Sequence, residues 1–322
     1  MKFMRRQRQR GVAVITALLL TTLAVTIVAS LFWQQQVQVR SMENQRLHLQ
    51  IQWILRGTLD WIALIMRQDG IDHSAYTSLQ HVWAVPLANT RIDQYIDRER
   101  VQGENFDASL SGQVFDANAR FNLTNLWENG QSNDEALVAF KKLLTSLRID
   151  PGLANGAQKL VAGGQVATVI DSNGATTAQS STSSSVKQMQ AIELEDLLEV
   201  PGFTPDMIET LRKYVVVLPQ RSLVNVNTAS AEVLSAVIPT LQLANAQSLV
   251  SNRKAWLTTP AFQDALGNNI PAGNLVDVKS EWFLVQSWLK LDRASLNTEA
   301  LLHRQLTQNT NYATNVVWVH QN

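Results

Sequence analysis

The most constraining feature of the sequence is a run of 23 residues without a charged side chain, from Gly11 to Trp33. Five basic residues and no acidic residue precede it, within the first ten positions. A helix needs about 20 mainly apolar residues to cross a bilayer, and threonine hydroxyls inside it can bond back to helix carbonyls. The run therefore predicts a transmembrane helix over residues 12–33.

The basic cluster favours a cytoplasmic N-terminus, which places the 289 residues after Trp33 on the far side of the membrane. A cleaved secretory signal is the alternative, because Val28-Ala29-Ser30 forms a small-residue site behind an apolar run. The charge-free run is longer than the apolar region of such signals, about 7–15 residues. We therefore expect a retained single-pass anchor.

Helical patterning continues beyond the charge-free run. Apolar residues recur every three or four positions until Gly70, namely Leu47, Ile51, Leu55, Leu59, Ile62 and Met66. This spacing predicts one continuous helix from Val12, with a stem over residues 34–70 that carries Trp53 and Trp61 on its packed stretch. The apolar face of the stem needs a sheet or other helices to cover it.

The N-terminus resembles a type IV prepilin signal: a short basic leader, residues 1–11, ends in Arg10-Gly11 and is followed by an apolar helix. The resemblance implies that a prepilin peptidase cleaves between Gly11 and Val12 and that Val12 is then N-methylated. Major pilins and pseudopilins carry a glutamate at the fifth mature position. This chain has Thr16 there.

The threonine at position 16 makes the resemblance more specific, because it points to one kind of pilin-like protein. An unpaired carboxylate in a bilayer costs about 2.5 to 3.5 kcal/mol, so family members keep it to pair with the N-terminal amine of the neighbour above. Type II secretion system protein K, a large minor pseudopilin at the pseudopilus tip, characteristically lacks it. Taken alone, Thr16 is equally consistent with an ordinary helix-compatible bilayer residue.

The rest of the chain predicts an α+β fold, in which the long helix packs on a small antiparallel, pilin-like sheet. Alternation over Leu110–Leu126 predicts a hairpin around Asp116-Ala117-Asn118, within a first head segment over 71–131. Strands are expected at Ser280–Lys290 and Val316–Val319, within a C-terminal head segment over 280–322. The residues between them, 132–279, are expected to form a large all-α insertion that begins with a helix over 133–148.

Two helix-hairpin-helix-like units are expected in the insertion, around Pro201-Gly202 and Pro239-Thr240, with Asn227 or Thr228 capping a helix. Protein K sequences carry this pair and the same Asn-Val-Asn-Thr-Ala phrase. In DNA repair proteins the motif binds phosphate, so a membrane-tethered DNA-binding protein is one alternative and a minor pilin of a type IV pilus is another. Without residues 1–11 the chain has 22 basic and 27 acidic side chains, a net charge of minus five, which disfavours nucleic acid.

A flexible loop is expected over residues 171–188, which are rich in Ser, Thr, Gly and Gln. Protein K relatives commonly carry an acidic, calcium-associated segment at this point, to which the loop has no counterpart. Asp171 and Asn173 are the calcium candidates, although a calcium ion takes six to eight oxygen ligands and no acidic residue follows before Glu193. No other cofactor is predicted.

Catalytic patterns are missing from the sequence. It has no cysteine and no phosphate-binding glycine loop, and its five histidines, His48, His73, His81, His303 and His320, are expected to be separate surface residues. The resemblance implies a structural, non-enzymatic minor pseudopilin of the cell inner membrane with a periplasmic body. It acts in protein secretion across the outer membrane, and its partners are other minor pseudopilins, the pseudopilus and the prepilin peptidase.

Overall fold

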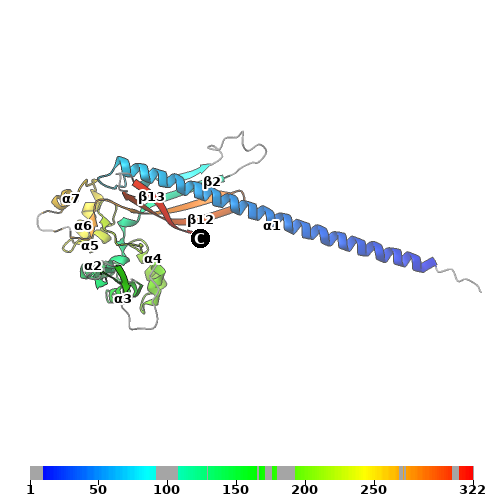
Figure 1. Cartoon of the computed structure of the whole chain (residues 1–322), viewed down its shortest axis with the longest axis horizontal. Coiled ribbons are helices and arrows are strands. Elements are labelled where there is room, and N and C mark those ends of the chain that lie inside the picture. The colour runs from blue at the N-terminus through cyan, green and yellow to red at the C-terminus, as the bar shows by residue number, and fades with distance from the viewer. Residues whose placement is uncertain are drawn as a thin grey trace, which may run out of the picture.

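A single helix, α1 (Arg10–Asp72), dominates the molecule. In this computed structural model the described residues are 10–91, 108–128, 130–164, 167–170, 176–179, 193–267, 271, 273–306 and 312–321. The 63 residues of α1 span about 95 Å at the usual rise per residue. Its N-terminal half projects away from the rest of the chain, and its C-terminal half lies along a sheet (Figure 1). The predicted continuous helix is confirmed, with two further residues at each end.

The stem of α1 buries one face. Ile51, Leu55, Leu59 and Met66 are buried, at the three-to-four spacing that the sequence showed. The expectation for the two tryptophans is wrong, because Trp53 is 70% and Trp61 is 49% exposed. Each follows a buried residue by two positions, which is about 200° around the helix. The stem therefore has an apolar side that the described residues leave exposed.

A five-stranded antiparallel sheet covers the stem, in the order β1-β2-β11-β12-β13. The strands are β1 (Leu87–Arg91), β2 (Ala108–Asp116), β11 (Trp282–Leu291), β12 (Ala294–Leu306) and β13 (Tyr312–Gln321). Phe283, Val285 and Leu302 face the helix and pack with Leu55, Leu59 and Met66. The predicted α+β, pilin-like arrangement is confirmed.

The sequence pattern did not predict β12, the longest strand of the sheet. Its apolar residues do not alternate: Ala300 and Leu302 pack toward the helix, whereas Leu301 packs on the other face with Trp282 and Leu284. A strand that is buried on both faces loses the period of two that reveals a half-buried one. Residues of the insertion cover part of this second face of β12.

The predicted hairpin at Asp116 is wrong. After β2 the chain makes a short 3-10 turn, η4 (Ala117–Ala119), and β3 (Phe121–Asn122) then pairs in parallel with β8 (Val215–Val216) rather than with β2. The Asp116 side chain accepts a hydrogen bond from the Asn118 amide and so fixes the turn. Phe121 is fully buried against Phe140, in the core of the insertion.

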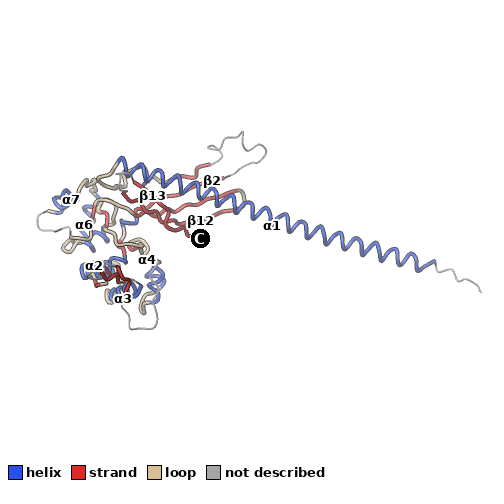
Figure 2. Tube along the Cα trace, viewed as in Figure 1, coloured by secondary structure: helices blue, strands red, loops and turns tan. Residues whose placement is uncertain are grey.

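The insertion is mainly helical and lies beside the far end of the sheet (Figure 2). Its helices are α2 (Asp134–Ser146), α3 (Leu153–Gly164), η6 (Leu194–Glu199), α4 (Pro205–Leu211), α5 (Ala231–Val237), α6 (Leu243–Ser251) and α7 (Thr259–Leu266). Contrary to the all-α expectation, residues 132–279 contain the short strand pairs β6 (Ala167–Ile170)/β7 (Thr176–Gln179) and β9 (Val224–Asn225)/β10 (Val276–Asp277). Two more pairs, β3/β8 and β4 (Trp127–Glu128)/β5 (Gln131–Ser132), join the insertion to the segment that precedes it. Two further 3-10 turns are η1 (Val82–Ala84) and η5 (Leu123–Leu126).

The two helical hairpins are present, as η6 with α4 and α5 with α6. The first turns at Gly202, whose φ of +107° is a conformation that favours glycine. The expected cap of α5 is wrong: the hydroxyl of Ser230, rather than Asn227 or Thr228, accepts from the Val233 amide. The expected loop 171–188 lies outside the described residues except for β7.

Candidate functional site

The projecting half of α1 presents a continuous row of exposed apolar side chains. It is long and apolar enough to cross a membrane, and none of its most apolar stretch is buried against the protein. Its large apolar side chains are about half exposed or more, including Val12, Leu18, Leu20, Ile27, Phe32 and Trp33. Soluble proteins rarely expose contiguous apolar patches of more than a few hundred Å². This surface therefore fits a lipid bilayer or a bundle of similar helices.

Thr16 lies on this surface, one turn after Val12. Its hydroxyl donates within the helix, at 3.1 Å from the Val12 carbonyl oxygen and 3.0 Å from that of Ala13. Thr21, Thr22 and Thr26 bond back in the same way. The hydroxyls are thus satisfied without a partner helix, and position 16 offers a neighbouring subunit no charge. Val12 is itself exposed, and Gly11 lies in the first turn of α1.

A buried ion pair fastens the end of α1 to the sheet. Arg304 of β12 and Asp69 of α1 are 3% and 5% exposed, and the Arg304 Nη1 atom lies 2.7 Å from Asp69 Oδ2. The guanidinium also donates to the Met66 and Ser280 carbonyl oxygens and to the Thr77 hydroxyl. It therefore ties together the helix, β12 and the two segments that flank them. The sequence reading did not find this pair, whose members are 235 residues apart.

A second buried carboxylate joins the sheet to the insertion. Asp116 Oδ2 accepts hydrogen bonds from the Ser280 hydroxyl at 2.5 Å, the Thr228 hydroxyl at 2.6 Å and the side-chain amide of Asn225 at 3.0 Å. Asp116 Oδ1 accepts one from the backbone amide of Asn118. Burial raises the pKa of Asp116, although these hydrogen bonds oppose that shift. The Asn-Val-Asn-Thr-Ala phrase therefore has a structural purpose, since it supplies Asn225 and Thr228 to this network.

Two basic residues beside the second helical hairpin, Lys142 of α2 and Arg253 after α6, serve the fold. Arg253 donates to the carbonyl oxygens of Asn227 and Ala229, and Lys142 donates to those of Ile238, Pro239 and Leu241 at the turn of the second hairpin. Burial lowers the pKa of both side chains. Because both cations are held by internal carbonyl groups, neither is free to bind phosphate.

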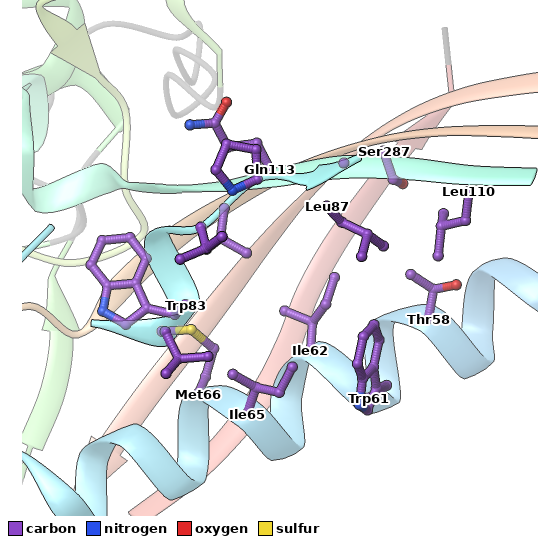
Figure 3. Close-up of a pocket in the computed structure, with 15 residues that line it drawn as sticks. Thr58, Trp61, Ile62, Ile65, Met66, Trp83, Leu87, Leu110, Gln113 and Ser287 are labelled. Carbon is purple, nitrogen blue, oxygen red and sulfur yellow. The ribbon is translucent and has the colours of Figure 1, made fainter. Parts of the chain in front are cut away.

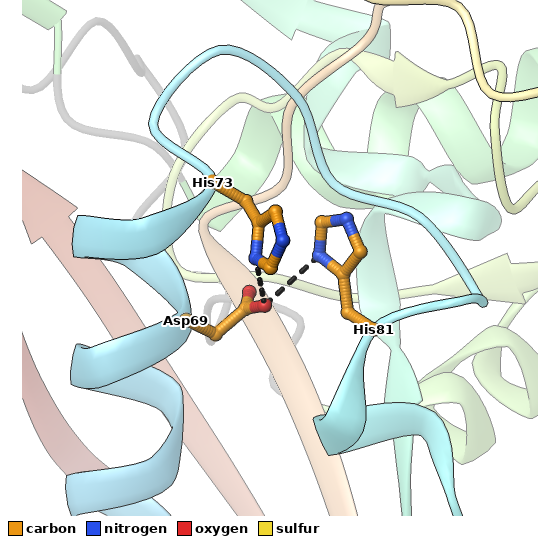
Figure 4. Close-up of side chains that lie close together, drawn as sticks. All are labelled: Asp69, His73 and His81. Atoms are coloured by element: carbon orange, nitrogen blue, oxygen red, sulfur yellow. Dashed lines mark hydrogen bonds and ion pairs between the residues drawn. The ribbon is translucent and has the colours of Figure 1, made fainter.

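Three of the five histidines are not the separate surface residues that the sequence predicted. His303 is 16% exposed and stacks on Trp282, and His73 and His81 lie together. His81 is 5% exposed, and its Nδ1 atom lies 2.9 Å from Asp69 Oδ1. His73 Nδ1 lies 3.0 Å from the same oxygen (Figure 4). The rings stack with centroids 3.9 Å apart. The chain reverses direction after α1, which brings His81 back to Asp69 and His73, two residues that are four positions apart.

An apolar cavity of about 240 Å³ opens between the stem and the sheet. Figure 3 shows Trp61, Ile62 and Ile65 of α1 on one side, opposite Leu87 and Leu110 of the sheet. Val82 and Val85, which also line it, are 74% and 68% exposed. This cavity extends the uncovered apolar side of the stem. The calcium candidates Asp171 and Asn173 and residues 1–9 of the leader lie outside the described residues, so both predictions stay predictions.

Comparison with known proteins gives a consistent result. Two family profiles described as type II secretion system (T2SS), protein K match residues 119–220 and 224–279. The chain is 25% identical to type II secretion system protein K of Pectobacterium carotovorum, over 92% of this chain and 93% of that protein. It is 26% identical to the Pseudomonas aeruginosa protein of that name, over 77% and 73% of the two chains.

A solved structure has the same fold. It is a chain of the GspK-GspI-GspJ complex of the type 2 secretion system of enterotoxigenic Escherichia coli. The two chains superpose with a TM-score of 0.64 over 87% of this chain and 99% of that one, at 15% sequence identity. The likeness shows that the two chains share a fold over most of the length of this one.

Proposed function

The chain belongs to the protein K family of the type II secretion system and is a minor pseudopilin, and from this premise we propose that it occupies the tip of the pseudopilus. The observation that carries this position is Thr16. Its hydroxyl is satisfied inside α1, so the helix presents no carboxylate to the amine of a subunit above it. A subunit with no neighbour above it needs no carboxylate at this position.

The anchor determines how the subunit enters the filament. The family relationship and the apolar helix identify a membrane-anchored protein. In our proposal the basic leader holds the N-terminus in the cytoplasm, so that the helix spans the inner membrane and the body lies in the periplasm. The prepilin peptidase cleaves between Gly11 and Val12, and the methylated Val12 amine pairs with the glutamate of the subunit below.

The shape of the head supports a capping role. The insertion lies beside the end of the sheet that is remote from the membrane helix (Figure 1). A body of this size at the upper end of the stem leaves little room for another subunit to stack on top. Other minor pseudopilins would pack below, along the exposed helix and the uncovered apolar side of the stem at Trp53 and Trp61. The role is structural, and we propose no catalytic step.

A glutamate at position 16 tests this proposal. In a strain that lacks its own protein K, the wild-type chain is expected to restore secretion of a periplasmic cargo protein. Thr16→Glu is expected to reduce secretion about tenfold or more, because an unpaired carboxylate at this depth costs about 2.5 to 3.5 kcal/mol. The matched control is Thr16→Val, which keeps the size and adds no charge.

Secretion and membrane levels of the chain are measured together in both variants. Normal secretion by Thr16→Glu at normal membrane levels would show that a partner amine lies above position 16, and would remove the subunit from the tip. Loss of secretion by Thr16→Val would show instead that the hydroxyl itself is required, which also contradicts the proposal.

A further inference from the structure

We propose that Asp69, His73 and His81 form a binding site for one divalent transition-metal ion, with Zn²⁺ as the best-matched ion. One oxygen of Asp69 and one nitrogen of each histidine all lie within 4.8 Å of one another. The three side chains come from the end of α1, from the residue that follows it and from the segment before η1. The inference is independent of the subunit's place in the pseudopilus.

The distances suit a small metal ion. In tetrahedral zinc sites the metal lies about 2.0 to 2.2 Å from nitrogen and oxygen ligands, which places neighbouring ligand atoms about 3.3 Å apart. Asp69 Oδ1 lies 3.0 Å from His73 Nδ1 and 2.9 Å from His81 Nδ1. An opening of a few tenths of an ångström admits the ion. His73, with a side chain that is 38% exposed, is free to make that movement.

The buried histidine needs a partner. The side chain of His81 is 4% exposed, its Nε2 atom has no hydrogen-bond partner among the described residues, and its Nδ1 atom has only the contact with Asp69 Oδ1 at 2.9 Å. A buried polar atom without a partner costs about 1 to 3 kcal/mol. Coordination through Nδ1 would satisfy this atom.

The surroundings of the cluster resemble the supporting shell of a metal site. Arg304 holds Asp69 through Oδ2 and leaves Oδ1 toward the histidines, as Figure 4 shows for the three ligands. Hydrogen-bonded carboxylates of this kind orient metal ligands. The exposed side of His73 provides an entry path and room for water as the fourth ligand. Two imidazoles and one carboxylate favour Zn²⁺ and related ions over Ca²⁺, which takes oxygen ligands.

Binding would fix the turn between the stem and the sheet. The ion would link the last turn of α1 to the segment that leads into η1 and β1, beside the apolar cavity at Trp61 and Val82. This is the segment that reverses the chain. A bound ion would therefore hold the entrance to the sheet in one conformation.

The test measures Zn²⁺ binding to the full chain, purified in detergent without a histidine tag and stripped with a chelator. Equilibrium dialysis at neutral pH is expected to give one Zn²⁺ per chain with a dissociation constant in the micromolar range or below. His73→Ala, a partly exposed position, is expected to weaken binding about 100-fold while leaving the circular dichroism spectrum unchanged. The control is His320→Ala, which removes an exposed histidine 3.5 Å from a carboxylate oxygen of Glu193.

A second metal ion, Co²⁺, tests which residues coordinate the metal. Co²⁺ is expected to show the visible absorption bands of a four-coordinate site in the wild type and in His320→Ala, but not in His73→Ala, and excess Ca²⁺ is expected to leave them unchanged. The proposal is overturned if no Zn²⁺ binds at about 100 µM, or if His73→Ala binds as tightly as the wild type. Displacement of Co²⁺ by Ca²⁺ would likewise overturn it.

Discussion

Replacement of Arg304 with methionine is expected to lower the free energy of unfolding by about 3 to 5 kcal/mol. The change removes one member of a buried ion pair and leaves Asp69 charged at 5% exposure. It also removes the guanidinium donor from the Ser280 carbonyl oxygen and one of two donors from the Thr77 hydroxyl, which still accepts from the Ser280 backbone amide. Methionine keeps much of the side-chain volume, so the loss is electrostatic rather than a cavity effect.

Urea unfolding of the chelator-treated full chain, followed by tryptophan fluorescence, measures this loss. The matched control is Arg293→Met: Arg293 lies 3.3 Å from Glu43 and is 69% exposed, and surface pairs of this kind contribute about 1 kcal/mol or less. Equal midpoints for the two variants would show that Arg304 does not hold the helix to the sheet.

Asp116→Ala is expected to cost about 3 kcal/mol or more and to loosen the insertion from the sheet. The substitution leaves four donors, from Asn118, Asn225, Thr228 and Ser280, without their acceptor in a buried position. A buried donor that is left without an acceptor costs about 1 to 3 kcal/mol, and the costs are not additive. Asp60→Ala, an exposed position on α1, is the control and is expected to change stability little.

The stability cost of Asp116→Ala also depends on pH. Burial raises the pKa of Asp116, so the folded chain binds a proton at a pH where the unfolded chain has lost it. The contribution of Asp116 is complete below its ordinary pKa of 3.8 and decreases as pH rises through the folded value. The cost of Asp116→Ala is therefore expected to be larger near pH 5 than near about pH 7.5. The opposite order, or a cost equal to that of Asp60→Ala, would contradict this account of the network.

The features that the sequence revealed are local ones. A charge-free run and a three-to-four spacing are both properties of neighbouring residues, and together they predict α1 and its buried face. The failures are non-local. From its neighbours in the sequence, Phe121 is predicted to lie in the second strand of a hairpin, but in the fold it packs on Phe140 and pairs with β8. Leu301 is a core residue because residues of the insertion help to cover its face of β12.

The cap of α5 shows a different limit. Asn227, Thr228 and Ser230 all precede the helix, and each type can cap one. Distant partners decide among them: Asp116 binds Thr228, and the backbone of Trp256 binds the side chain of Asn227. The buried pair of Asp69 and Arg304, which are 235 residues apart, was hidden for the same reason. Polar residues that fold together from distant segments carry no signal in the order of the chain.

The intact mass of the chain, purified from membranes, tests the central claim most directly. A pseudopilin that is anchored by α1 and processed at the leader begins at N-methylated Val12 and retains the whole apolar helix. A mass that corresponds to a chain beginning near Leu31 would mean that the helix is a secretory signal and is removed. That result would contradict the account, because it would leave the body without its anchor and Thr16 without a place in the filament.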